Sequence, residues 1–383
     1  MFSGKSAVKL FGMFSTVAAF ALLGFVPGTR LAAQTTGDVY VLSNSEENAV
    51  IVFHRNADGT IARAGSFRTG GSGAGSGTNP LHSQGPVILS ADNRMLFAVN
   101  AGSDSISAFA VSGDELTLLQ TISSGGERPV SLTVSHDLLY VLNGGGSPNI
   151  TGFRIVPEGS PLVRIEGSTQ AVPRGEVAAP AGVLFNPEGN VVLVSETGAN
   201  QIASFTISEE GRAQFDDTYA STGSGPFGFA FAHNNVLVGA YTANDAPGEA
   251  GAGSYMVTPA GDVNPLSPAV NDRGTGSTWL VVTGSGQLAF TTNTVSGTIS
   301  SYSVSRESGN LSLSRPVAAA LRGEESGSLF PSDMALSNSS RFLYVRNGAN
   351  GTVSGFLVHE GGSLTPVASA EGLPESAAGI AAR

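Results

Sequence analysis

Short runs of β-branched and aromatic residues alternate with polar turns along almost the whole chain. Each run leads into a polar turn and a second alternating run, which is the pattern of a β-hairpin. Six clear copies span Val39–Phe53, Leu96–Phe109, Leu139–Phe153, Val192–Phe205, Leu288–Tyr302 and Leu343–Phe356, and a looser seventh spans Val236–Tyr255. Copies that recur about every 50 residues predict the blades of a propeller.

One template describes every blade: an inner strand, a bottom turn, a second strand, a top loop, a third strand, another bottom turn and an outer strand. Proline is tolerated at a strand start because no ladder donor is lost there. The predicted inner strands begin at Pro86, Pro129, Pro180, Pro226 and Pro331, with Trp279 in that place in the sixth blade. Asp-Asn and Gly-Asn pairs in the bottom turns suit tight reversals.

The two ends of the repeat array complement one another. Val39 begins a blade at its second strand, whereas Ala377–Ala381 resembles an inner strand with nothing after it. Pairing the two would close the ring and leave no unpaired edge. We therefore predict an all-β fold over residues 34–383, a seven-bladed β-propeller of four-stranded blades in which Ala377–Ala381 pairs with Val39–Leu42.

The first 33 residues lack the blade pattern. Lys5 and Lys9 precede an apolar stretch from Leu10 to Val26, and Leu31-Ala32-Ala33 suits a peptidase cut after Ala33. This arrangement predicts a secretory signal peptide over residues 1–33, and hence a periplasmic or secreted protein. A retained anchor is the alternative, although the apolar stretch is short for a membrane span.

Charge limits the partners of the mature chain. Removal of residues 1–33 leaves 16 Lys and Arg against 30 Asp and Glu, a net charge of −14. Such a surface repels phosphate backbones and anionic lipid, so we expect no nucleic acid and no membrane as a partner. The chain has no cysteine, so its stability depends on a packed core rather than on disulfides, and we expect a monomer.

Two irregular insertions fall on the top face, Gly70–Gly85 before the second blade and Thr242–Gly253 within the fifth. Such loops on a rigid scaffold commonly carry function. The composition of Gly70–Gly77 is also typical of a flexible loop.

The inner-strand prolines, the LYV-x-N second strands and the T-I/V-S-x-F third strands resemble the YVTN-type repeats of the seven-bladed propeller lactonase family. That family includes 6-phosphogluconolactonase-like and carboxymuconate-cyclase-like proteins. The resemblance covers nearly all of the mature chain and implies the propeller fold with a lactone-acting site. Propellers of this pattern also host unrelated functions.

The resemblance implies a Glu, Arg and His constellation in the channel, of which one position in four is matched. Glu196 fills the Glu position at the end of a second strand. The Arg position after Pro180 holds Ala181, and a Pro-His-x-His start is replaced by Pro129-Val130-Ser131. A further Arg in the next blade is replaced by Ala240 and Tyr241.

Lactone hydrolysis needs a base that deprotonates the attacking water and a cation or hydrogen-bond donor that stabilises the oxyanion. Glu196 is the candidate base, Arg128 the candidate cation and His82 the candidate proton relay. Each also has a structural interpretation. Glu196 could bond turn amides as the Asn residues of sister blades do, Arg128 could pair with Glu127, and His82 could be a solvated loop residue.

Other chemistries lack a sequence signature. There is no G-x-S-x-G, no Lys-Ser/Thr ending to the glycine-rich stretch and no H-x-x-x-H spacing. Asn244-Asp245 to Glu249 could offer oxygen ligands to Ca²⁺ but matches no known loop pattern. We expect neither a cofactor nor a metal, and we interpret Trp279 as packing rather than a ligand platform.

Two functional hypotheses remain. The first is an exported hydrolase that acts on a sugar or carboxylic lactone at the top mouth of the channel. The second is a non-catalytic binding or scaffold propeller whose top loops hold an unknown protein partner. The sequence leaves open whether the protein is an enzyme.

Overall fold

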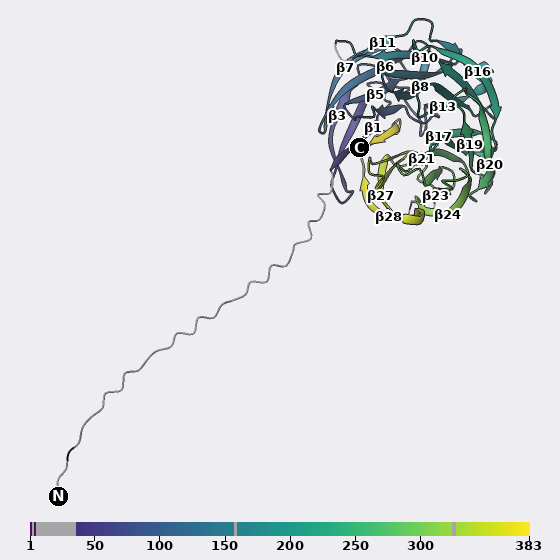
Figure 1. Ribbon diagram of the computed structural model, residues 1–383. Coiled ribbons are helices and arrows are strands. Elements are labelled where there is room, and N and C mark those ends of the chain that lie inside the picture. The colour runs from purple at the N-terminus through teal and green to yellow at the C-terminus, as the bar shows by residue number, and fades with distance from the viewer. Residues whose placement is uncertain (2–3, 5–35, 157–158, 324–326) are drawn as a thin grey trace. The chain divides into compact units, whose positions relative to one another are not determined.

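Seven β-sheets surround a central axis in the computed structural model, which describes residues 1, 4, 36–156, 159–323 and 327–383 (Figure 1). The predicted seven-bladed propeller is confirmed. The predicted signal peptide, residues 1–33, lies outside the described residues except for Met1 and Gly4. Within the described part, no helix has the length and apolar character that a membrane crossing requires.

The strands run outward from the axis in each blade. Blade 1 consists of β29 (Ala378–Ala382), β1 (Gly37–Leu42), β2 (Ala49–Arg55) and β3 (Ile61–Arg68). Blade 2 consists of β4 (Val87–Leu89), β5 (Met95–Asn100), β6 (Ser105–Ser112) and β7 (Glu115–Ser123). Blade 3 consists of β8 (Glu127–Ser135), β9 (Leu138–Gly145), β10 (Asn149–Ile155) and an outer edge in two pieces, β11 (Leu162–Arg164) and β12 (Gln170–Ala171).

The other blades follow the same order. Blade 4 consists of β13 (Pro180–Phe185), β14 (Val191–Glu196), β15 (Gln201–Ile207) and β16 (Ala213–Ala220). Blade 5 consists of β17 (Pro226–Phe231), β18 (Val236–Tyr241), β19 (Gly251–Val257) and β20 (Val263–Asn271). Blade 6 consists of β21 (Ser277–Val282), β22 (Leu288–Asn293), β23 (Thr298–Val304) and β24 (Leu311–Ala320). Blade 7 consists of β25 (Pro331–Leu336), β26 (Phe342–Asn347), β27 (Thr352–Val358) and β28 (Leu364–Ala370).

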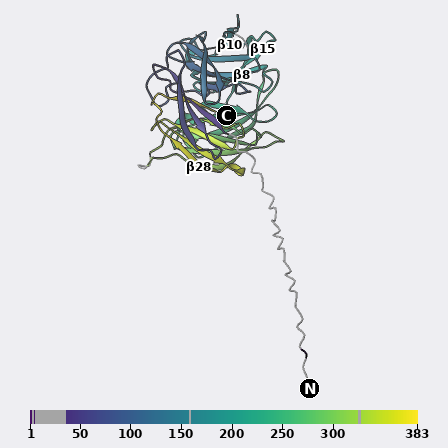
Figure 2. The ribbon, with the colours of Figure 1, turned by 90° about the vertical axis from the view of Figure 1, so that its left-hand side faces the viewer.

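Three short 3-10 helices lie in the loops of the described residues: η1 (Gly175–Ala178), η2 (Ala243–Asp245) and η3 (Glu360–Gly362). Figures 1 and 2 place β28 of blade 7 across the ring from β8 and β10 of blade 3.

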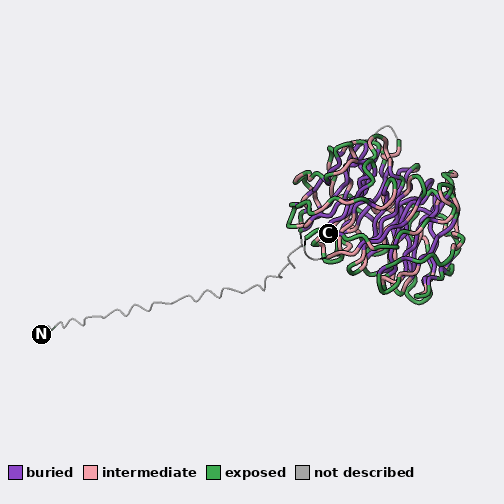
Figure 3. Tube along the Cα trace, turned by 90° about the horizontal axis from the view of Figure 1, so that it is seen from above, coloured by how far each residue is buried: buried purple, intermediate pink, exposed green. Residues whose placement is uncertain are grey.

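Burial falls from the middle of each blade to its outer edge. Every residue of the second strands β1, β14 and β26 is buried, whereas the outer strands β7 and β16 are largely exposed. Figure 3 shows buried chain in the interior of the ring and exposed chain at its periphery. Second strands therefore carry continuous apolar runs because blades pack against both of their faces.

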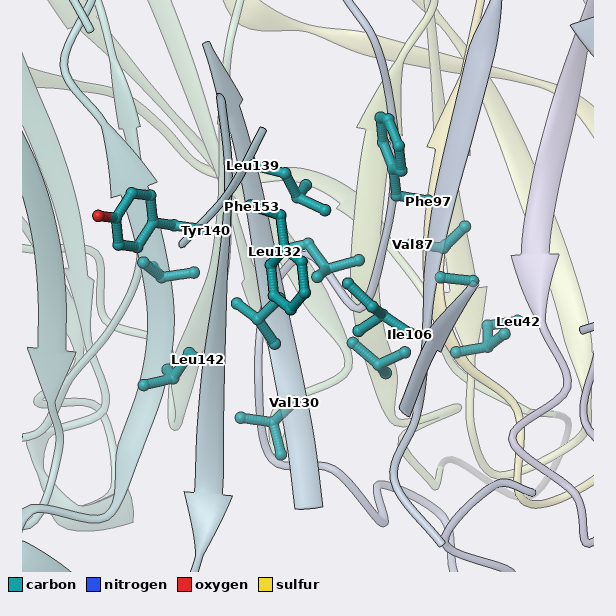
Figure 4. Packing of buried hydrophobic residues seen from close by; sticks show 14 of the residues in the cluster. Leu42, Val87, Phe97, Ile106, Val130, Leu132, Leu139, Tyr140, Leu142 and Phe153 are labelled. Carbon is teal, nitrogen blue, oxygen red and sulfur yellow. The ribbon is translucent and has the colours of Figure 1, made fainter. Parts of the chain in front are cut away.

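The core lies between the blades. Leu42 of blade 1, Val87 and Phe97 of blade 2 and Leu132 and Tyr140 of blade 3 belong to one apolar cluster (Figure 4). Tyr140 also contacts Phe185 of blade 4 edge to face, with ring centroids 5.6 Å apart. Each blade thus buries its side chains against the next, which removes apolar surface from water without any disulfide.

The ring closes as predicted. Strand β29 pairs antiparallel with β1, with Val39 opposite Ala382 and Leu42 opposite Ala378. The observed strand begins and ends one residue later than the predicted segment Ala377–Ala381. A register shift between Val41 and Leu42 accompanies a left-handed backbone at Gly379, whose φ is 81°.

Candidate functional site

The segment from Thr78 to Gly85 fills the centre of the ring on its way to the inner strand of blade 2. Ser83 Oγ donates to the Val130 carbonyl of blade 3 at 2.6 Å, and Trp279 Nε1 of blade 6 donates to the Ser83 carbonyl at 2.9 Å. The Leu81 side chain is buried. Gly70–Gly77, whose composition is typical of a flexible loop, is therefore followed directly by a segment that hydrogen bonds hold in place. We call this segment, Thr78 to Gly85, the axial segment.

Gln84 is the most connected residue of the axial segment. Its backbone N–H donates to Ala181 of blade 4, and its Nε2 donates to the Phe229 carbonyl of blade 5 at 3.0 Å. Its Oε1 accepts from the Leu280 N–H of blade 6 at 3.0 Å. One side chain thus satisfies backbone groups of inner strands that would otherwise face the channel unpaired.

Blade 7 holds both ends of the axial segment. Arg346, a buried residue, donates from Nη1 to the Thr78 carbonyl at 2.9 Å. The Asp333 carboxylate accepts from the backbone N–H groups of Met334, Ile380 and Gly85. Burial raises the pKa of Asp333 to about 7 and lowers the pKa of Arg346 to about 10, because both charged forms are poorly solvated there.

His82, which belongs to the axial segment, and Arg128, at the start of β8, lie near one another on the top face. Arg128 Nη2 donates to the Pro80 carbonyl at 2.7 Å, and the Arg128 backbone N–H donates to Asp104 Oδ1 at 2.7 Å. Both His82 and Arg128 are exposed. The structure therefore brings together the candidate relay and the candidate cation.

Asp245, in the top loop of blade 5, lies near enough to His82 for its carboxylate to act on the imidazole. Desolvation by surrounding atoms and the positive charge of Arg128 lower the pKa of His82, and the Asp245 carboxylate opposes this shift. The lowered pKa favours the neutral imidazole, which is the form that can accept a proton.

The same three residues share an unusual backbone. His82, Arg128 and Asp245 have φ values of 48°, 52° and 58°, and Ala243 and Asn244 beside Asp245 are left-handed as well. Left-handed backbone also occurs in ordinary turns of this chain, for example at Asn93 and Asn200, so here it shows that these three side chains project from tight turns. The sequence pointed to Asp245 only as a possible Ca²⁺ ligand and not as a neighbour of His82, because that proximity depends on how three separate loops converge.

Glu196 lies apart, in the contact between blades 3 and 4. It is fully buried, and its Oε2 accepts from Gln201 Nε2 at 2.7 Å. Burial raises the pKa of Glu196 to about 7, against the opposing effects of Gln201 and of the Arg174 charge. Neither His82 nor Arg128 is among the groups that shift this pKa.

The sister asparagines explain the position of Glu196. Asn100, Asn293 and Asn347 each donate from Nδ2 to Ser or Thr hydroxyls five and seven residues later, which ties the second strand to the third. Glu196 makes the corresponding link to Gln201, five residues later. Its Oε1 is buried without a hydrogen-bond partner among the described residues, so it retains one unsatisfied acceptor.

The fold matches that of known propellers. The family model described as "Lactonase, 7-bladed beta-propeller" matches residues 31–177 and 254–373. The chain belongs to this family. No curated protein matches it.

Solved structures share the fold at low sequence identity. A Lactobacillus plantarum protein superposes with a TM-score of 0.71 at 16% identity, covering 91% of this chain and 99% of that protein. The periplasmic gluconolactonase of Pseudomonas aeruginosa gives 0.67 at 17%, covering 90% and 98%. A candidate 6-phosphogluconolactonase of Bacteroides fragilis gives 0.64 at 18%, covering 91% and 98%.

Proposed function

We propose that this protein is an exported lactonase-type hydrolase that acts on a sugar or carboxylic lactone at the top face. The observation that carries the proposal is the proximity of His82, Arg128 and Asp245, which come from three different loops. Family membership and the similarity to a gluconolactonase support the reaction class.

The chemistry assigns one role to each residue. Neutral His82 accepts a proton from the attacking water, and Arg128 stabilises the oxyanion formed at the lactone carbonyl. The His82 imidazolium then returns this proton to the ring oxygen, which leaves as the ring opens, and neutral His82 is restored. Asp245 would stabilise the imidazolium that forms in between.

Glu196 is the proposed alternative base. A carboxyl group whose pKa is about 7 is well matched to proton transfer at neutral pH. Because Glu196 is completely buried, the water that attacks the lactone would have to reach its Oε1 through the contact between blades 3 and 4. The two assignments differ in which substitution stops turnover.

The test measures acid release from a panel of aldonolactones and muconolactones by residues 34–383. We expect His82→Asn and Arg128→Met to lower kcat/KM by about 10²-fold. The matched controls are His359→Asn and Arg94→Met, exposed residues of the opposite face. Loss of turnover in Glu196→Gln with undiminished turnover in His82→Asn assigns the base to Glu196, whereas the reverse result assigns it to His82.

A non-catalytic binding propeller is the second candidate, because the axial segment fills the centre of the ring where a substrate would otherwise enter. Its partner would contact the loop Thr242–Gly253 on the top face. Absence of turnover across the lactone panel would favour this candidate.

Export and a monomeric state are further parts of the proposal. The periplasmic location of the similar gluconolactonase supports export. N-terminal sequencing of material from an expressing cell should begin at Gln34, and size-exclusion chromatography should give a monomer. A chain that begins at Met1 in the exported fraction would contradict the cleavage.

A further inference from the structure

A cavity of about 710 Å³ opens on the bottom face at the end of blade 1. Blade 1 contributes Asp38 and His54, the bottom turns of blade 2 contribute Asp92 and Asp114, and Arg383 follows strand β29. The volume lies within the range of small-molecule sites. The cavity is on the face opposite to His82 and Arg128.

Asp38 and His54 form a carboxylate–imidazole pair in this wall. They are register partners on β1 and β2, and His54 Nδ1 lies 3.4 Å from Asp38 Oδ1. The Asp38 side chain is 2% exposed, whereas that of His54 is 43% exposed. Asp38 is thus covered and His54 faces the solvent side.

The two oxygens of Asp38 differ in their partners. Oδ2 accepts from Arg383 Nε and Nη2 at 2.8 and 2.6 Å and from Tyr40 at 3.4 Å. Oδ1 has no hydrogen-bond partner among the described residues. The nearby His54 Nδ1–H is the donor available to it, and this selects the tautomer whose Nε2 is an acceptor.

The cationic side chains of the cavity are engaged by the protein itself. Besides Asp38, Arg383 donates to the Gly113 carbonyl at 2.7 Å. Arg55 donates to the Arg383 carbonyl at 3.0 and 3.2 Å and lies over the Phe342 ring. Both arginines therefore already bind protein groups. An anionic ligand would be repelled by the carboxylates of Asp92 and Asp114, and these arginines would not offset that repulsion.

The remaining lining groups both donate and accept hydrogen bonds. Asn93, Asn338 and Ser339 provide amides and a hydroxyl, and Asp92 and Asp114 provide acceptors. Hydroxyl groups complement such a mixture because each is a donor and an acceptor at once.

We propose that this cavity is a binding site for a neutral polyhydroxylated molecule such as a monosaccharide, in which a ligand hydroxyl donates to His54 Nε2 and Asp38 positions the imidazole. The site does not depend on the proposed lactonase activity. Because its walls include β1, β2 and the residue after β29, ligand binding also stabilises the closed ring.

The experiment uses saturation-transfer NMR with residues 34–383 and five probes: glucose, galactose, myo-inositol, gluconate and glucose 6-phosphate. We expect a neutral probe to bind and to raise the melting temperature. His54→Asn should weaken binding by at least about tenfold, because Asn reproduces Nδ1 but not Nε2. His54→Gln, which extends a polar group to the Nε2 position, should retain more affinity.

His359→Asn is the matched control, an exposed histidine elsewhere on the bottom face, and should bind like the parent. Asp38→Asn is informative only if its melting curve shows a folded ring, since Asp38 also bonds Arg383. Three results would overturn the proposal: no probe binds at millimolar concentration, His54→Asn leaves binding unchanged, or glucose 6-phosphate binds more tightly than glucose. Loss of lactone turnover with intact sugar binding would contradict the proposed function alone.

Discussion

The side chain of Gln84 occupies the space into which a side chain at Gly228 would project. A Cβ built at Gly228 would lie 2.0 Å from Gln84 Oε1, 2.8 Å from the Thr278 carbonyl and 3.0 Å from the Leu280 N–H. The glycine of blade 5 and the glutamine of the axial segment are thus directly complementary in shape.

Gly228→Ala should therefore destabilise the fold by about 1–3 kcal/mol through overpacking. Chemical denaturation measures the effect. Gly239→Ala is the control, because the nearest atom to its Cβ, Tyr255 Cε2, is 3.7 Å away. The cost of Gly228→Ala should be smaller in a Gln84→Ala background, and equal costs in both backgrounds would contradict the pairing.

Trp279, the single tryptophan, reports on the axial segment because its Nε1 bonds the Ser83 carbonyl. If the segment is an integral part of the ring, the red shift of tryptophan emission and the loss of far-UV circular dichroism should coincide on denaturation. An emission change that precedes the loss of β-structure would show that the segment leaves the axis separately.

Asp333 should make stability depend on pH. Folding raises its pKa from 3.8 to about 7, so it favours the folded state fully below about pH 4. This contribution, on the order of a few kcal/mol, is lost as the pH rises through about 7. Asp333→Asn should be less stable at pH 5, where it loses an acceptor, but its melting temperature should fall less between pH 5 and 8. Parallel curves for parent and variant would contradict the assignment.

Deletion of residues 373–383 should open the ring. It removes β29, exposes the inner edge of β1 and takes Leu373, Ala377 and Ile380 out of the cluster between blades 7 and 1. We expect a much lower melting temperature and association through the free edge, measured by calorimetry and size-exclusion chromatography. Ile380→Ala, which keeps the strand, should cost only about 2–5 kcal/mol. Retention of a stable monomer by the truncated chain would refute the closure argument.

The architecture could be predicted from the sequence because blades are local. Runs such as Leu96–Phe109 contain their own turn and alternation, so each hairpin is visible in a short window. Closure was predictable for a related reason. The array ends in one extra inner strand, Ala377–Ala381, and its first blade, which starts at Val39, lacks an inner strand. Pairing rules then require that they meet.

The sites were decided by the tertiary structure, because their residues meet across large sequence separations. The sequence pointed to His82 and Arg128 as separate candidates. Their proximity to Asp245 depends on the conformations of three loops, which the repeat period does not determine. Glu196 matched a family position, yet its burial beside Gln201 follows from how blades 3 and 4 pack. Gln84 lies in the insertion Gly70–Gly85, to which the sequence assigned no internal contacts, and only the ring of inner strands around it gives its amide partners on blades 5 and 6. Local periodicity sets which strands form, whereas side-chain chemistry at the axis depends on contacts that exist only once the ring has closed.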